Sequence, residues 1–322
     1  MPMRRREFLT VVASAALAAP AVVRADESWP KRAVKLVVPY APGGSTDLVA
    51  RPWAEKLSEA FGEQFVIENR GGASGMIGTE AVAKAPADGY TYLVGTTTSL
   101  VTLPLLRKLA YDPRAFVPVG RVGDAVTGFV IHPGTGIKTF PEMVAYAKQN
   151  PGKLAFGSSG VGTAPHIRFE LMRQAAGIDI LHVPYRGGAD TLNDLLAGAI
   201  HLMNESSSLP HVRAGKLTLL NVNYHKRIAE FPDVPTLTEL GYPGIDGGSW
   251  FGVHGLKAVP RSILEKFNAK LVEIGQTAEM QDRILKANAI LMPQTLEEIA
   301  KHMEYEAEIT IRAVKSAGIK AE

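Results

Sequence analysis

The stretch VKLVVPYAPGGSTDLVARPWAEKLSEAF, residues 34–61, passes from an apolar run through a glycine-rich loop into a helical pattern. The run 34–38 is short and rich in valine, which is typical of a buried strand. Gly43 and Gly44 suit a tight turn, and the hydroxyl residues after them suit a helix N-terminus. Strand, loop and helix in this order form the repeating unit of α/β proteins, so the stretch predicts that fold class.

The same alternation continues along the rest of the chain. Short apolar, β-branched runs predict strands at 34–38, 65–68, 91–95, 117–122, 129–131, 154–156, 180–183, 201–203, 217–222 and 251–254. Between them, amphipathic patterns predict helices at 46–61, 76–84, 98–107, 140–149, 164–176, 189–199, 261–277 and 295–317. This order predicts mainly parallel sheets with helices on their faces.

Composition and charge exclude several classes of protein. The chain has 322 residues, 46% hydrophobic and 21% charged, which is ordinary for a folded protein of about two domains. Cysteine is absent, which excludes disulfide scaffolds, cysteine-based metal sites and thiol nucleophiles. The net charge of +3 lies in residues 1–25, where four arginines face one glutamate, so the remaining 31 bases (35 − 4) and 31 acids (32 − 1) cancel. Without a basic patch, nucleic acid is not an expected partner.

The N-terminus has the features of an export signal. Arg4, Arg5 and Arg6 precede an apolar stretch at 8–23, and Val23-Arg24-Ala25 fits a cleavage site after Ala25. The apolar stretch is shorter than the roughly 20 residues of a spanning helix. Arg5-Arg6-Glu7-Phe8-Leu9 also resembles the twin-arginine motif, so both that route and general secretion stay open. We expect a mature protein in the periplasm that does not span the membrane; an amphipathic N-terminal helix is the alternative.

Three glycine- and hydroxyl-rich loops each follow a predicted strand and precede a predicted helix, at 38–47, 68–75 and 156–163. In open α/β sheets, ligands bind beyond the carboxyl ends of strands. Glycine lets the backbone approach a ligand, and the free N–H groups of a helix start favour an anion. Helix capping by Ser45, Thr46 and Thr163 is the alternative. Because loops 38–47 and 156–163 fall in different predicted domains, we favour an anion site that they share.

The patterns of common catalytic sites are missing. Neither Ser45 nor Ser159 lies in a Gly-x-Ser-x-Gly elbow, and there is no Gly-Lys-Ser/Thr phosphate loop. His166 and Glu170 would share a helix face, but two ligands are too few for a metal site. We therefore expect a binding protein without catalytic residues, metal or cofactor. A hydrolase remains an alternative, with Ser159 and His166 as nucleophile and base.

Beyond these features, the chain resembles the substrate-binding components of tripartite tricarboxylate transporters, the Bug family. The resemblance covers nearly the whole mature chain, and the order and spacing of its motifs make it specific. The matching stretches are VVPYAPGGSTD (37–47), VIENR (66–70) with Gly78, DGYT (88–91), FGSSGVGT (156–163) with His166, HVPYRGG (182–188), PDVPT (232–236), GYPG (241–244) and SWFG (249–252).

The resemblance implies a two-lobed periplasmic binding fold of type II, which closes on its ligand like a Venus flytrap. Lobe one would comprise 26–127 and 249–322, and lobe two 128–248. Such a protein captures a small organic carboxylate and delivers it to the membrane components of a tripartite tricarboxylate-type transporter. We expect a monomer that is not an enzyme. A periplasmic sensor that presents its ligand-bound state to a membrane receptor is an alternative.

The resemblance also implies which residues bind the ligand. Gly43 and Gly44 would offer N–H groups, while Asp47 would cap its helix or hold the loop because like charges repel. Tyr40 and Tyr185 would line the pocket, with core packing as the alternative for Tyr40. Backbone amides and hydroxyls would recognise the carboxylate. The predicted ligand-binding residues are Tyr40, Pro42, Gly43, Gly44, Asp47, Thr97, Thr98, Ser158, Ser159, Gly162, Thr163, His166, Tyr185 and Asn204.

One segment departs from the family. Where relatives often read Leu-Met-Phe-Asp, this chain has LMNESSS at 202–208. An aromatic residue and an acid are replaced by Asn204, Glu205 and three serines. This change predicts a polar distal end of the pocket, suited to a hydroxylated or doubly charged acid.

Overall fold

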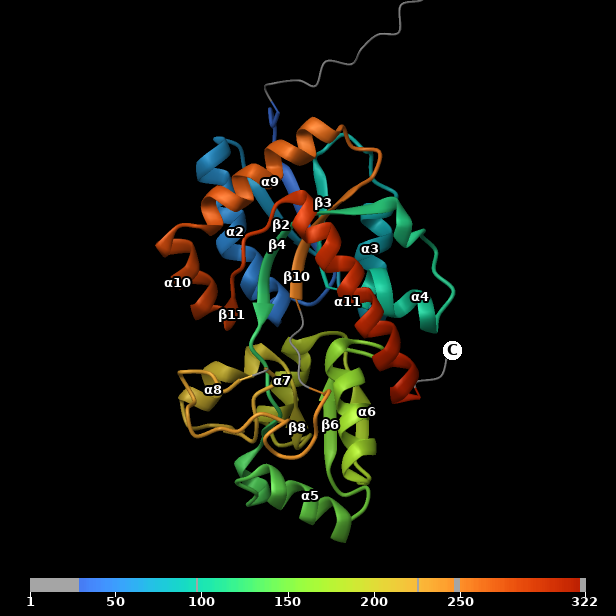
Figure 1. The fold of residues 1–322 in the computed structure, drawn as a ribbon, viewed down its shortest axis with the longest axis vertical. Helices are drawn as coiled ribbons and strands as arrows, with labels where there is room; N and C mark the ends of the chain where they lie inside the picture. Colours follow the sequence, from blue (N-terminus) through green and yellow to red (C-terminus); the bar gives the residue numbers. More distant parts are fainter. Residues whose placement is uncertain (1–28, 97, 225, 246–249, 319–322) are drawn as a thin grey trace, which may run out of the picture.

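The computed structural model describes residues 29–318 apart from 97, 225 and 246–249, and it places two β-sheets in two separate halves of the molecule (Figure 1). The export signal predicted at 1–25 lies outside the described residues. The strands are β1 (Val34–Val38), β2 (Phe65–Asn69), β3 (Thr91–Gly95), β4 (Phe116–Ala125), β5 (Val130–Ile131), β6 (Ala155–Ser158), β7 (Leu181–Pro184), β8 (Leu202–Met203), β9 (Thr218–Leu219), β10 (Trp250–Leu256) and β11 (Ala289–Ile290).

Helices cover the faces of both sheets. They are α2 (Ser45–Phe61), α3 (Met76–Ala83), α4 (Leu103–Leu106), α5 (Phe140–Gln149), α6 (Ala164–Ala176), α7 (Gly188–Leu196), α8 (Leu209–Arg213), α9 (Arg261–Gly275), α10 (Ala278–Lys286) and α11 (Leu296–Ala317). A π-helical turn, Thr98–Thr102, leads into α4. In the part of the chain that the structure describes, no helix combines the length and apolar character that crossing a membrane requires.

The two sheets are mixed rather than mainly parallel, which corrects the prediction from sequence. The first has the order β11-β4-β10-β3-β1-β2 and the second the order β7-β6-β8-β5-β9. Strands β1, β2 and β3 pair in parallel, as do β6, β7 and β8, whereas β10 is antiparallel to β3 and β4. The reason is the crossing of the chain: β4 leads out of the first sheet and β10 returns to it, so these neighbours must run in opposite directions.

Most predicted elements match the structure closely. The bounds of β1 and β3 equal the predicted ones, and those of α5 and α6 do as well. Three elements were missed, namely α8, α10 and β11. The predicted lobe boundary near 127 falls between β4 and β5, where the chain passes from the first sheet to the second, and the boundary near 249 lies outside the described residues. As boundaries of moving bodies both stay a prediction.

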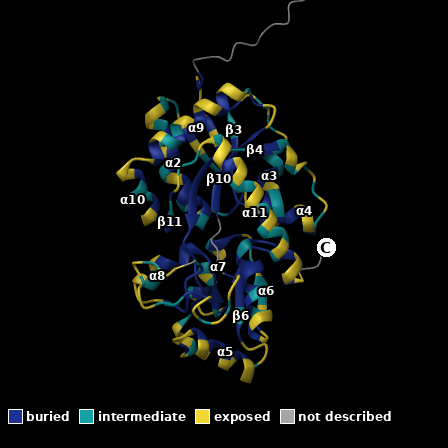
Figure 2. Ribbon diagram, viewed as in Figure 1, coloured by how far each residue is buried: buried dark blue, intermediate teal, exposed yellow. Residues whose placement is uncertain are grey.

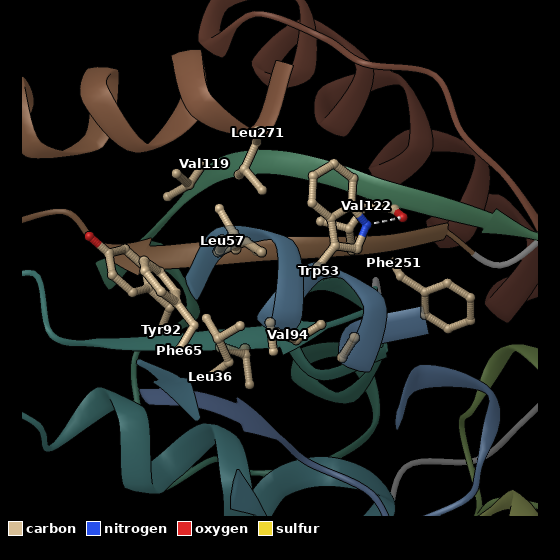
Figure 3. Close-up of a cluster of buried hydrophobic side chains, with 14 of the residues drawn as sticks. Leu36, Trp53, Leu57, Phe65, Tyr92, Val94, Val119, Val122, Phe251 and Leu271 are labelled. Atoms are coloured by element: carbon tan, nitrogen blue, oxygen red, sulfur yellow. Dashed lines mark hydrogen bonds between the residues drawn. The ribbon is translucent and has the colours of Figure 1, made fainter. Parts of the chain in front are cut away.

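The larger hydrophobic core lies around the first sheet. Most strands are buried, apart from the edge strands β2 and β7, and many exposed residues lie on the outer sides of the helices (Figure 2). Trp53 of α2 is buried, and its indole N–H donates to the carbonyl of Val122 at 2.8 Å, which ties the helix to β4 (Figure 3). In the other half, the rings of Phe156 and Phe169 stack at 4.2 Å and join β6 to α6.

The last helix, α11, joins the two halves. Thr295 and Glu298 form a capping box at its start. Near its end, the Gln174 side chain of α6 donates to the carbonyl of Ala317 at 2.5 Å, beside an apolar cluster that includes Val314 and Ile167. The helix therefore begins on the first half and ends against the second, as Figure 1 shows.

Gly128 lies on the outgoing crossing between β4 and β5, where no side chain fits. A Cβ atom there would lie 1.9 Å from the carbonyl oxygen of Asn221 and 2.6 Å from a methyl group of Leu219. Since backbone cannot move aside, we expect Gly128→Ala to lower the free energy of unfolding by about 1–3 kcal/mol. Urea denaturation would measure the change, and a loss under about 0.5 kcal/mol would contradict this packing.

Candidate functional site

A small cavity of about 40 Å³, with room for only a few water molecules, lies between the two halves. Both halves contribute to its wall, and most of the contributed residues are small or carry a hydroxyl or amide. The lining residues are Tyr40, Gly44, Ser45, Thr46, Thr96, Thr98, Ala125, Thr127, Ser159, Thr163, Ala164, Pro165, Gly188, Asn204, Glu205, Ser206 and Phe251.

The starts of three helices, α2, α6 and α7, meet at this cavity. Their first residues, Ser45, Ala164 and Gly188, all line it. N–H groups in the first turn of a helix have no carbonyl partner within the helix, and the helix dipole makes this end positive. Among the described lining residues there is no lysine, arginine or histidine. The positive potential of the site therefore comes from backbone.

The contribution of α7 was missed by the reasoning from sequence, although a signal for it was present. Gly187 and Gly188 follow the strand β7 and precede an amphipathic segment, which is the same pattern as in the two loops that were singled out. Gly188 also faces the first half across the cavity: a Cβ atom added at Gly44 would lie 3.7 Å from the amide nitrogen of Gly188.

In the first loop, residues 38–47, the backbone amide of Gly43 is bonded within the loop itself, which corrects the prediction for Gly43. Its N–H donates to the Asp47 carboxylate at 2.9 Å and is therefore not free for a ligand. Asp47 also accepts from Asn69 at 3.0 Å and pairs with Arg51 at 2.8 Å. The φ of +79° at Gly43 shows that the turn itself needs this glycine. Pro42, Gly43 and Asp47 thus support the loop and do not line the cavity.

In the second loop, residues 156–163, the backbone amide of Gly162 is likewise bonded within the protein. Its N–H donates to Nδ1 of His166 at 3.0 Å, so this amide too is occupied, contrary to the prediction. The imidazole of His166 stacks on that of His182 at 4.0 Å. Burial lowers the pKa of His166 to about 4, and the charge of Arg173 adds to the effect. His166 is therefore neutral at pH 7 and supports the loop from behind.

Two neighbouring serines on this loop point to different places. Ser159 lines the cavity, whereas the Ser158 hydroxyl is fully buried and lies 2.7 Å from Nε2 of His182. Among the described residues no hydrogen bond joins Ser159 to His166: Nδ1 of His166 accepts from the N–H of Gly162, and Nε2 lies 3.9 Å from the Glu170 carboxylate. The contacts of this pair therefore give the hydrolase alternative no support.

The other predicted site residues divide in two groups. Tyr40, Gly44, Thr98, Ser159, Thr163 and Asn204 line the cavity, and their contact with a ligand stays a prediction. Tyr185 does not line it; its hydroxyl donates to Asp194 at 2.7 Å beside a separate surface hollow. Thr97 lies outside the described residues. The Tyr40 hydroxyl lies 3.3 Å from that of Thr96, and burial raises the pKa of Tyr40.

Glu205 was not predicted as a ligand-binding residue, although it belongs to the segment that departs from the family. Its side chain lines the cavity with 6% of the residue exposed. One oxygen, Oε1, has no hydrogen-bond partner in the described part of the chain. The other, Oε2, packs on Gly188, where an added Cβ atom would lie 2.0 Å away. Burial raises the pKa of Glu205 to about 7, although the hydroxyl and amide of Ser159 oppose the shift.

The two halves touch around the cavity. The Ser74 hydroxyl donates to the carbonyl of Val161 at 2.8 Å, and the N–H of Ser207 donates to the Ser45 hydroxyl at 3.2 Å. Both contacts join residues of the first half to loops of the second. The structure therefore has the cleft in a closed arrangement.

Sequence comparison identifies relatives of one family. Residues 49–290 match the family model described as "Tripartite tricarboxylate transporter family receptor". Protein BugT of Bordetella pertussis is 36% identical over 271 residues, which are 83% of this chain and 82% of BugT.

Solved structures agree with this assignment. The chain superposes on R. palustris Rpa4515, solved with adipate, with a TM-score of 0.88 and 33% identity, covering 91% of this chain and 100% of that one. It superposes on the periplasmic binding protein BugD with a TM-score of 0.86 and 32% identity, with the same coverage. The likeness confirms a fold of the periplasmic binding protein type.

Proposed function

The chain belongs to the tripartite tricarboxylate transporter receptor family, the Bug family, and we propose that it is a periplasmic protein that captures a small organic carboxylate. In this proposal it delivers the ligand to the membrane components of a tripartite tricarboxylate-type transporter. The family and fold are those of substrate-binding proteins, which are not enzymes. Adipate in the R. palustris relative supports a carboxylate as the class of ligand.

The observation that carries the proposal is the convergence of the starts of α2, α6 and α7 on one cavity whose described lining contains no cationic side chain. A carboxylate in this position would accept hydrogen bonds from first-turn N–H groups and from hydroxyls such as that of Ser159. Bonds to an ionised acceptor contribute more than neutral ones. An uncharged ligand would gain less from the same groups.

Capture would depend on closure of the lobes that we propose at 26–127 with 249–322 and at 128–248. The lining residues come from both, so only the closed arrangement lets one ligand contact Gly44 and Ser159 together. A ligand shifts a conformational equilibrium by its differential affinity for the two states. Bound carboxylate would therefore stabilise the closed state, which is the form offered to the transporter.

Binding can be tested on the chain from Asp26 onwards with adipate and succinate against their uncharged diamides. We expect the acids to raise the melting temperature and the diamides to have no effect. Ser159→Ala should weaken acid binding about tenfold or more, since a hydrogen bond to a charged group is lost. Ser158→Ala is the matched control, because the Ser158 hydroxyl faces His182 rather than the cavity. Equal binding of acids and diamides would contradict the proposal.

Delivery is tested separately in the cell. Deletion of the gene should abolish uptake of the labelled acid that the purified protein binds, and the wild-type gene should restore it. If uptake persists while a membrane receptor loses its response to the acid, the protein is a sensor and the transport part of the proposal is wrong.

A further inference from the structure

Four consecutive residues beside the cavity carry buried polar atoms without hydrogen-bond partners in the described chain. The atoms are Asn204 Nδ2, Glu205 Oε1, Ser206 Oγ and Ser207 Oγ. Buried polar groups are normally satisfied, so such a cluster indicates groups that are paired by something outside the chain. Asn204, Glu205 and Ser206 line the cavity, which gives a polar ligand access to them.

The orientation of the Asn204 amide is set by a chain of hydrogen bonds that starts at backbone. The N–H of Phe129 can only donate, and it donates to Oδ1 of Asn221 at 3.2 Å. Asn221 Nδ2 then donates to Asn223 Oδ1 at 2.8 Å, and Asn223 Nδ2 donates to Asn204 Oδ1 at 2.7 Å. A flip of any one of these amides would place two donors or two acceptors opposite each other. Asn204 therefore presents its amide nitrogen, a donor, as its free group.

Glu205 presents the opposite character. A carboxylate only accepts hydrogen bonds, and no cationic side chain lines the described cavity to pair with it. A ligand that placed a second carboxylate here would bring two acids together without a cation between them. A ligand with a hydroxyl or ammonium group would instead supply the donor that Oε1 lacks.

We propose that Asn204 and Glu205 together select a carboxylate that carries a hydroxyl or ammonium group next to it. Asn204 donates to the ligand carboxylate, and Glu205 accepts from the neighbouring donor. The proposal rests on the proposed function, because it assumes that a carboxylate occupies this cavity. It makes Glu205 a residue that determines which carboxylate binds, rather than one that holds the loop.

Two matched sets of ligands test the selection, namely succinate, malate and aspartate, and propionate, lactate and alanine. Within each set only the group next to one carboxylate changes, from hydrogen to hydroxyl to ammonium. Calorimetry on the wild-type protein should give a malate or aspartate affinity about tenfold or more above that of succinate, or the same order in the smaller set. The two substituted members distinguish a hydroxyl ligand from an ammonium ligand.

The variant Glu205→Gln should reduce this preference about tenfold while succinate binds as well as before or better. Glu304→Gln removes the same charge from an exposed position of α11 and should leave the preference unchanged. The comparison within the wild type needs no variant, so it remains valid even if Glu205→Gln is poorly folded.

Three results would overturn the inference. The first is equal binding of all three members in the wild type, and the second is a preference that Glu205→Gln leaves intact. In both cases carboxylates still bind, so the proposed function stands while the selection by Glu205 is wrong. The third is that no carboxylate binds at all, which contradicts the proposed function as well.

Discussion

Between pH 6.5 and pH 4, the wild-type protein should lose about 3 kcal/mol more of its free energy of unfolding than the variant His254→Gln does. His254 lies in β10 with 1% of its surface exposed. Burial lowers its pKa to about 4, and neither ring nitrogen has a hydrogen-bond partner among the described residues. A base with a lowered pKa contributes stability that is complete above its unfolded pKa of 6.5. That stability is lost as the pH falls towards 4, because the unfolded chain binds a proton that the folded one rejects.

Urea denaturation of the wild type and the variant at pH 7 and at pH 4 measures this effect. The stability that each protein loses between the two pH values is determined, and the two losses are compared. Any difference in stability between variant and wild type that is the same at both pH values cancels, so only the change between the two pH values counts. His132→Gln is the control, because His132 is half-buried and lies in a turn at the surface. His166 and His182, whose pKa values burial also lowers to about 4, keep part of the acid sensitivity in the variant. Equal acid sensitivity of wild type and His254→Gln would contradict the prediction.

The fold was predictable wherever local signals mark both ends of an element. Strand β1 is a valine-rich run that ends before Pro39, and α6 begins after Thr163 and ends before Gly177, so their bounds follow from residues close in sequence. Strand β11 is only two residues long and forms by pairing with β4, far away along the chain. The direction of β10 likewise depends on how the chain crosses between sheets. Such features have no local signal.

The site was predictable as a region but not atom by atom. The two glycine-rich loops do meet at one cavity, which their position after strands predicts. Which amides stay free depends on side-chain partners within each loop, and here Asp47 and His166 occupy the N–H groups of Gly43 and Gly162. The burial of Glu205 depends on its packing against Gly188, which a pattern of residue types does not reveal.

In the ligand-free protein, the substitution Glu205→Gln should change the free energy of unfolding more favourably at about pH 8 than at pH 4.5, by up to about 3 kcal/mol. Burial raises the pKa of Glu205 from 4.5 to about 7. An acid with a raised pKa contributes stability that is complete below its unfolded pKa and is lost as the pH rises through the folded value. Above about pH 7 the wild type must hold a buried carboxylate without a cation beside it, and glutamine does not carry that charge.

The same experiment connects stability to binding. Glu304→Gln, at an exposed position, should show no such dependence on pH, and a flat difference for Glu205→Gln would contradict the prediction. A ligand that gives Oε1 a hydrogen-bond donor compensates the buried charge, so saturating ligand should shrink the advantage of the variant at about pH 8. A residue that destabilises the empty protein and is relieved by the ligand favours the closed, occupied state. The free energy that Glu205 costs the empty fold then becomes part of the discrimination between carboxylates.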